Sequence, residues 1–143
     1  MDKVIVVYWS QTGNTAAMAE AVGQGITEAG KEAVICDVSS ASIEELKAAK
    51  AFAMGCPAMG AEVLEEMEME PFVEEVEGFA SGKKILLFGS YGWGDGQWMR
   101  DWEERMSGAG AELVNGEGFI CQEMPDDAAV DELKSLGKQM AQM

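Results

Sequence analysis

Five short apolar runs alternate with five helix-length amphipathic segments along this chain, and this order limits the possible folds. The predicted strands are Lys3 to Tyr8, Ala33 to Val38, Ala51 to Gly55, Lys84 to Gly89 and Glu112 to Cys121. The predicted helices are Thr15 to Ala29, Ser42 to Ala49, Glu70 to Phe79, Gln97 to Gly108 and Asp126 to the C-terminus. Runs such as VIVVY and ILLF are apolar on both faces, which is typical of parallel strands covered by helices on either side. The sequence therefore predicts an α/β fold with a doubly wound parallel sheet.

Length and composition are those of one ordinary globular domain. The chain has 143 residues, of which 48% are hydrophobic and 25% charged, and it contains no fixed-period repeat or linker that would divide it. We therefore expect a single domain over residues 1–143. No stretch approaches the length of a membrane span, and the N-terminus has no signal-peptide pattern. These features predict a cytoplasmic protein.

Several kinds of chemistry are excluded by residue content and charge. The three cysteines lack metal-ligand spacing, and no histidine is present to complete a Cys/His metal site or a Ser-His-Asp triad. The formal net charge is −16, which argues against nucleic acid or anionic lipid as a partner. We expect no metal, a basic protein partner, and a monomer.

The segment Ser10 to Thr15, SQTGNT, joins the first predicted strand to the first predicted helix. Backbone N–H groups at a helix start lack partners within the helix, Gly13 allows the backbone to come close, and the hydroxyl groups add donors. The segment lacks the GK[ST] ending of a triphosphate-binding loop. It favours a phosphate monoester held by neutral donors. The alternative is that these polar residues only cap the helix.

Two further loops should reach the same edge of the sheet, because ligands of such folds bind where loops leave the carboxyl ends of the strands. These are residues 56–62, CPAMGAE, and residues 90–96, SYGWGDG. A flat aromatic ligand would fit between Met59 of one loop and Trp93 of the other. Each residue alone is as consistent with ordinary packing as with a ligand site, but their joint placement favours a ligand site.

Three stretches resemble the flavodoxin family, in particular the short-chain flavodoxins of anaerobic bacteria. They are VYWSQTGNT, GCPAMGAEVLEE and LFGSYGWGDGQWMRDWEERM. The likeness covers essentially the whole chain, and the interruption of the last predicted strand by only Asn115 to Glu117 is typical of the short-chain type. The resemblance implies a flavodoxin-like, doubly wound, five-stranded parallel sheet in the order 2-1-3-4-5, with helices on both faces.

The same resemblance implies FMN as a noncovalently bound cofactor. The phosphate would lie on residues 10 and 12–15, and the ring between Met59 and Trp93. Gly60 would present its backbone carbonyl to flavin N5, and Glu62 would accept the N3 hydrogen. The cofactor-binding residues implied in this way are Ser10, Gln11, Thr12, Gly13, Asn14, Thr15, Pro57, Ala58, Met59, Gly60, Ala61, Glu62, Ser90, Tyr91, Gly92, Trp93, Gly94, Asp95 and Gln122.

At three of these positions the chain departs from the family pattern. Pro57 replaces a hydroxyl residue of some relatives, Ala61 replaces Asp or Ser, and Gln122 stands where Asn is expected.

The function implied is that of a low-potential electron carrier without substrate turnover, which moves single electrons on the semiquinone/hydroquinone couple of FMN. A negative charge added near N1, beside a dianionic phosphate and in a protein of charge −16, would make the second electron strongly reducing. Glycine at position 60 would let its peptide turn at positive φ on the first reduction. A bulky residue there should therefore lower the semiquinone yield.

Eight glutamates are concentrated in the middle of the chain: Glu62, Glu65, Glu66, Glu68, Glu70, Glu74, Glu75 and Glu77. Apolar residues alternate with them, so most of the group is expected to edge an ordinary helix. We expect the part nearest residues 56–62 to dock basic redox partners by electrostatic steering.

Two other functions are compatible with an α/β fold of this size. A small FMN-dependent quinone or nitro reductase would also need a substrate pocket and usually a nicotinamide site, which no segment supplies. A cofactor-free signalling domain would need a phosphate-accepting Asp at a strand end, where this chain has Ser10, Cys56 and Ser90.

Overall fold

Strands and helices alternate as the sequence pattern predicts. The computed structural model describes residues 3–11, 13–60, 63–92 and 94–143. The elements are β1 (Lys3–Tyr8), α1 (Asn14–Glu28), β2 (Glu32–Asp37), the 3₁₀ turn η1 (Val38–Ser40), α2 (Ile43–Ala48), β3 (Ala51–Gly55), α3 (Met69–Glu77), β4 (Lys84–Tyr91), α4 (Gln97–Gly108), β5 (Glu112–Leu113), the 3₁₀ turn η2 (Val114–Gly116), β6 (Phe119–Gln122) and α5 (Asp127–Ala141).

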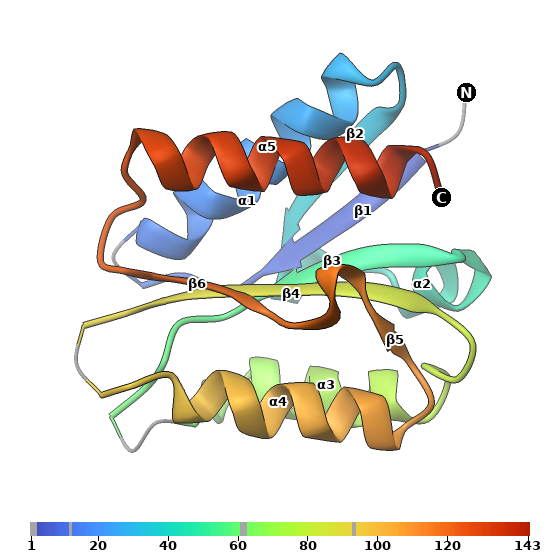
Figure 1. The fold of residues 1–143 in the computed structure, drawn as a ribbon. Helices are drawn as coiled ribbons and strands as arrows, with labels where there is room; N and C mark the ends of the chain where they lie inside the picture. The colour runs from blue at the N-terminus through green and yellow to red at the C-terminus, as the bar shows by residue number, and fades with distance from the viewer. Residues whose placement is uncertain (1–2, 12, 61–62, 93) are drawn as a thin grey trace.

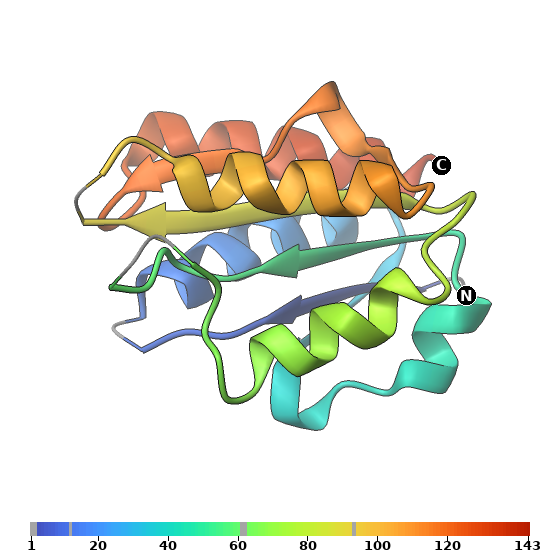
Figure 2. The same cartoon turned by 90° about the horizontal axis from the view of Figure 1, so that it is seen from below.

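The sheet is parallel and has the order β2-β1-β3-β4-β5, with β6 also paired to β4. This confirms the predicted order 2-1-3-4-5. In register, Val7 of β1 lies opposite Cys36 of β2 and Met54 of β3. The carboxyl ends of β1, β3, β4 and β6 lie at one edge of the sheet, at the left of Figure 2. The connections that follow these four strands leave the sheet at this edge.

The last strand differs from the prediction of one run over residues 112–121. It is broken into β5 and β6, which pair with separate parts of β4: residues 84–85 and residues 88–91. The turn η2 lies between them, with Asn115 at φ 68. Asparagine is one of the few residues other than glycine that tolerates this left-handed conformation. Because β5 ends at Leu113 and β6 begins at Phe119, the interruption between them is longer than the predicted Asn115 to Glu117.

Helices cover both faces of the sheet. The helices α1 and α5 lie on one face, and α3 and α4 lie on the other (Figure 1). Alternate residues of β1 point to opposite faces: Val4 and Val6 pack in the cluster under α1 and α5, whereas Ile5 and Val7 pack in the other cluster. A strand buried on both faces explains why the VIVVY run is apolar throughout.

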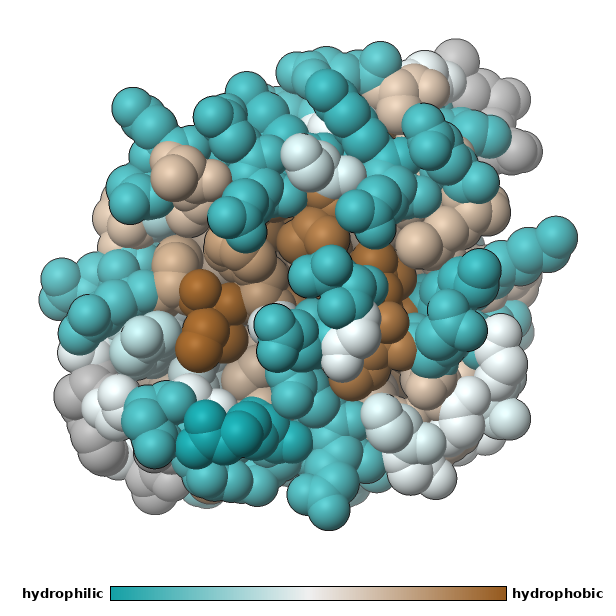
Figure 3. All heavy atoms as spheres, viewed as in Figure 1, coloured by the Kyte–Doolittle hydropathy of each residue, from teal (hydrophilic) through white to brown (hydrophobic). Residues whose placement is uncertain are grey.

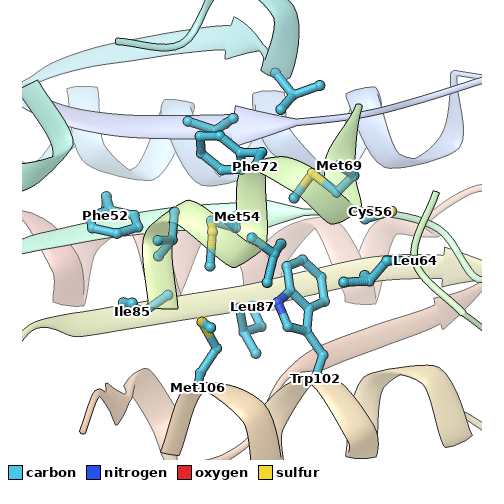
Figure 4. Close-up of a cluster of buried hydrophobic side chains, with 14 of the residues drawn as sticks. Phe52, Met54, Cys56, Leu64, Met69, Phe72, Ile85, Leu87, Trp102 and Met106 are labelled. Carbon is cyan, nitrogen blue, oxygen red and sulfur yellow. The ribbon is translucent and has the colours of Figure 1, made fainter. Parts of the chain in front are cut away.

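The core under α3 and α4 is rich in aromatic rings and sulfur (Figure 4). Trp102 is 1% exposed, and its indole Nε1 has no hydrogen-bond partner among the described residues. Trp98, one helical turn earlier, donates its indole N–H to the carbonyl of Cys56 at 3.1 Å. This bond ties α4 to the end of β3.

The helices α1 and α5 pack closely through glycine. A Cβ atom on Gly25 of α1 would lie 2.0 Å from the carbonyl oxygen of Lys134, and one on Gly137 of α5 would lie 2.1 Å from that of Val22. Both contacts are with backbone, which cannot move aside as a flexible side chain can. The two glycines therefore set the distance between these helices.

Side chains at helix ends and between helices fix the outer layer. Asp126 begins α5 by accepting a hydrogen bond from the N–H of Ala129 at 2.8 Å. Arg105 of α4 donates to Glu70 (2.8 and 2.9 Å) and to Glu77 (2.7 Å), which joins α4 to α3. In Figure 3, hydrophilic side chains cover α5 and α4, and apolar atoms reach the surface between them. None of the helices in the described ranges is long and apolar enough to cross a membrane.

Candidate functional site

A pocket of about 230 Å³ lies at the carboxyl edge of the sheet, where the three predicted loops meet. Its lining comes from the β1–α1 segment, the β3–α3 loop, the end of β4 with the residue that follows it, and one residue after β6. The lining residues are Ser10, Gln11, Asn14, Thr15, Pro57, Ala58, Met59, Ser90, Tyr91, Gly92 and Glu123. The convergence of the three loops, predicted from the order of the strands, is thus present in the fold.

The β1–α1 segment presents the start of a helix to this pocket. Gly13 precedes α1 at φ 95, and no atom lies within 4 Å of the position its Cβ would take. Within the segment, Ser10 Oγ accepts hydrogen bonds from the N–H groups of Gly13 (3.1 Å) and Ala16 (3.3 Å). The Ser10 hydroxyl hydrogen is left to donate outward. The segment thus combines a helix start, an open backbone and a hydroxyl donor.

Two of the predicted hydroxyl groups bond to each other. Thr15 Oγ1 and Ser90 Oγ are 3.0 Å apart, and the two residues are 1% and 4% exposed. The bond links α1 to β4, so it fixes two walls of the pocket relative to each other. One hydroxyl of this pair still has a hydrogen to donate.

The β3–α3 loop supplies an apolar wall. Pro57, Ala58 and Met59 line the pocket, and the N–H of Ala58 donates to the carbonyl of Ser90 at 3.0 Å. Gly60 is exposed, its φ lies outside the left-handed region, and a Cβ there would meet nothing within 4 Å. The positive φ predicted for Gly60 on reduction would therefore require its peptide to turn from this conformation.

The third side of the pocket is the end of β4. Tyr91 lines it, and its ring lies 5.8 Å from that of Trp98, centroid to centroid. Gln122 of β6 donates to the carbonyl of Gly92 at 3.3 Å, and the N–H of Glu123 donates to the carbonyl of Tyr91 at 2.8 Å. These bonds hold the segment after β6 against the segment after β4.

The predicted binding residues fall into three groups. Ten of them line the pocket, while Gly13, Gly60, Gly94, Asp95 and Gln122 are not part of its lining. Asp95 instead accepts from Arg100 at 3.0 Å. Thr12, Ala61, Glu62 and Trp93 lie outside the described residues. Glu123, which has a positive φ of 58, lines the pocket but was not predicted.

The thiol of Cys56, next to the pocket, is protonated at neutral pH. Cys56 is buried, and burial raises the pKa of its thiol to about 12. A thiol that is protonated at neutral pH is a poor nucleophile.

Among the described members of this glutamate cluster, four bond to other parts of the fold, including Glu68, whose Oε1 accepts from the indole N–H of Trp9 at 3.3 Å. Glu70 and Glu77 bind Arg105, and Glu65 is buried with its carboxylate on the backbone N–H groups of Met67, Glu68 and Met69. Glu62 lies outside the described residues, and Glu66, Glu68, Glu74 and Glu75 are exposed. Most of the described glutamates thus belong to α3 or to the turn before it, as the alternation with apolar residues predicted.

Glu65 contributes to stability in a pH-dependent way. Burial alone would raise the pKa of this carboxyl, but the three N–H donors stabilise its ionised form and bring the pKa below its ordinary value of 4.5. This stabilisation is fully present above the unfolded-state pKa and is lost as the pH falls through the lower folded-state pKa.

We therefore expect the difference in free energy of unfolding between wild type and Glu65→Gln to be constant above about pH 6 and to shrink below about pH 4.5. Urea titrations of the two apoproteins at several pH values measure it. A difference that grows on acidification would contradict the assignment.

Comparison with known proteins decides the family. The family model described as flavodoxin matches residues 6–137. The flavodoxin of Clostridium beijerinckii is 52% identical over 136 residues, which cover 95% of this chain and 97% of that protein. The chain belongs to the flavodoxin family.

Other relatives and solved structures agree. The flavodoxin of Megasphaera elsdenii is 40% identical over 138 residues, covering 96% of this chain and 98% of that protein. The solution structure of two-electron reduced Megasphaera elsdenii flavodoxin superposes with a TM-score of 0.86, at 38% identity, over 98% of this chain and 99% of that chain. A flavodoxin from the domain Archaea gives a TM-score of 0.87 at 32% identity, over 98% of this chain and 96% of that chain.

Family membership establishes the general activity. Flavodoxins bind FMN and carry electrons, and they are not enzymes with substrates of their own. The chain is an FMN-dependent electron carrier of the short-chain type, as its motifs predicted. A quinone or nitro reductase is not favoured by these relatives.

Proposed function

We propose that residues 1–143 form a single FMN-binding domain, with the phosphate at the start of α1 and the ring against the β3–α3 loop and the end of β4. When bound, FMN takes up and releases single electrons. The residues of the chain bind the cofactor, orient it and set the midpoint potential of each one-electron step. The residues proposed to bind FMN are the same residues that the sequence predicted.

The chemistry of the pocket supports this assignment. One end has the open backbone at Gly13, the hydroxyl of Ser10 and the start of α1, a donor set that suits a phosphate monoester. The other end has Pro57, Met59 and the ring of Tyr91, which suit a flat apolar ring system. The residues that are present therefore fit FMN.

Titration of the apoprotein with FMN tests the proposal directly. We expect one equivalent of FMN to bind with quenching of flavin fluorescence and to give a yellow protein after gel filtration. Riboflavin, which lacks the phosphate, should bind far more weakly. Equal affinity for the two compounds would contradict a phosphate site at the start of α1.

Gly60 is proposed to present a backbone carbonyl that can change its orientation. Open space around Gly60 lets the peptide turn. A Gly60→Val variant should leave the unfolding temperature of the apoprotein nearly unchanged, because its Cβ meets no atom in this conformation. It should lower the first midpoint potential by about 40 mV relative to the second, since a side chain at positive φ costs about 1 kcal/mol. Redox titration of the holoprotein measures this, and an unchanged separation would contradict the proposal.

The electron carrier is proposed to act at low potential on basic partners, as a monomer. A net charge of −16 disfavours additional negative charge at the site and opposes self-association. Glu66 and Glu68 are exposed on the turn of the β3–α3 loop that precedes α3, and Met67 between them is 83% exposed. An acidic edge with an apolar centre suits a partner whose apolar contact is surrounded by lysine or arginine.

Electron transfer to a basic c-type cytochrome should slow at least tenfold as the ionic strength rises from about 10 mM to about 300 mM, because screening removes steering. Stopped-flow mixing measures the rate. Glu66→Gln should reduce the rate at low salt more than Glu112→Gln, which removes the same charge at the opposite, amino edge of the sheet. A rate that hardly depends on salt, or equal effects of the two variants, would contradict docking at this edge.

A further inference from the structure

Glu65 is a buried carboxylate at the base of the β3–α3 loop, and only 7% of the residue is exposed. Its Oε1 accepts hydrogen bonds from the N–H groups of Glu68 (2.7 Å) and Met69 (3.0 Å), and its Oε2 accepts one from Met67 (2.8 Å). Its own N–H donates to Cys56 Sγ at 3.5 Å. Three charge-assisted bonds from one side chain hold the turn before α3 in a fixed place.

The described parts of the loop that Glu65 closes are two anchored legs and, at the tip, Gly60 with Met59 and Val63. In the first leg, the N–H groups of Cys56 and Ala58 donate to carbonyls of β4 at 3.1 and 3.0 Å. In the second leg, Leu64 is 4% exposed and lies in the core (Figure 4), and Glu65 follows it.

At the tip, the N–H of Met59 donates to the carbonyl of Val63 at 3.0 Å, and Gly60 has open space. The Gly60 peptide can change its orientation without moving the rest of the loop only while both legs stay fixed.

We propose that Glu65 is a positioning residue for electron transfer: by fixing the second leg of the loop, it sets where the Gly60 carbonyl stands and hence the difference between the two midpoint potentials. This inference rests on the proposed FMN site. Glu65 does not line the pocket, so it acts through Val63 and Met59, which are hydrogen-bonded to each other. Without the three hydrogen bonds to the Glu65 carboxylate, the second leg would lose its fixed position. Each new orientation of the tip would then require the leg to be ordered again, which costs conformational entropy.

The test compares two variants that remove the same charge from adjacent residues. Glu65→Gln keeps the length of the side chain but replaces one oxygen by NH₂, which leaves at least one backbone N–H facing a donor. Glu66→Gln removes the charge of the neighbouring, exposed residue. Both holoproteins are titrated electrochemically, and the FMN affinity of both apoproteins is measured by fluorescence.

In Glu65→Gln we expect the two midpoint potentials to approach each other by about 59 mV, a tenfold change in the equilibrium that their separation measures. The Kd for FMN should rise about tenfold. In Glu66→Gln the two potentials should shift together. Glu65→Asp, which keeps the charge and can still reach part of the donor set, should recover part of the separation. It also serves as the variant to measure if Glu65→Gln does not fold.

Amide hydrogen exchange of the apoprotein provides a readout independent of FMN. The amides of Met59 and of residues 67–69 should exchange at least tenfold faster in Glu65→Gln than in Glu66→Gln. A fall in unfolding temperature with an unchanged separation of potentials would overturn the proposal and leave Glu65 as a helix cap. Unchanged exchange at Met59 would also overturn it. A wild-type protein that binds no FMN would instead contradict the proposed function.

Discussion

A Gly25→Ala apoprotein should unfold about 6–9 °C below wild type. The added Cβ would lie 2.0 Å from the carbonyl oxygen of Lys134, so α1 and α5 must move apart along their contact. Overpacking of this kind costs about 2–3 kcal/mol, and each kcal/mol lowers the unfolding temperature of a domain of this size by about 3 °C. Thermal unfolding followed by circular dichroism measures the shift without the stabilisation that a bound cofactor adds.

Gly108→Ala is the matched control for this variant. Gly108 ends α4, and a Cβ there would meet no atom within 4 Å. Alanine is the better helix former by up to about 1 kcal/mol, so this variant should be slightly more stable than wild type. If Gly25→Ala were also stabilising, helix propensity would outweigh the backbone contact, and the two helices could not be packed as closely as described.

An Asn14→Asp variant should bind FMN about 100-fold more weakly than wild type while its apoprotein becomes no less stable. Asn14 is the first residue of α1 and lines the pocket. A carboxylate close to the bound phosphate costs about 2.8 kcal/mol in a partly screened site. The same carboxylate at a helix start is favourable by about 0.3–1 kcal/mol. Cofactor affinity and apoprotein stability should therefore change in opposite directions.

Asn115→Asp makes the same substitution in the exposed turn η2, away from the pocket. It controls for the change in net charge and should leave the Kd for FMN within about twofold of wild type. Fluorescence titration measures both variants. An unchanged Kd in Asn14→Asp would favour the alternative in which the polar residues of the segment Ser10 to Thr15 only cap α1.

The architecture could be predicted because its signal is local. A strand buried on both faces is apolar at every position, so the bounds of β1 and β3 coincide with the predicted Lys3 to Tyr8 and Ala51 to Gly55. The predicted end of β4 was too early. The strand continues two residues beyond Gly89, because residues 88–91 pair with β6. Pairing with a distant strand leaves no mark in the local pattern.

The site was predictable in outline and not in its supporting contacts. The convergence of three loops follows from strand order, but the bond between Thr15 and Ser90 joins residues 75 positions apart. Glu65 belongs to a run of glutamates that looks uniform in sequence, and only the folded chain distinguishes its buried carboxylate from the exposed one of Glu66. Thr15 and Ser90 are partners over a long range, and Glu65 differs from Glu66 in its burial. The local sequence indicates neither property.

The break between β5 and β6 leaves a place where the chain can be lengthened. Leu86 and Leu87 of β4 face the break without strand partners on that side among the described residues, and residues 115–117 are exposed. Extra residues there would interrupt no ladder hydrogen bond, and the closure entropy of a surface loop rises only slowly with its length. A peptide tag or a fluorescent label could therefore be inserted after Gly116, and the molecule could be tethered there while the edge of the sheet that bears the pocket stays open to partners.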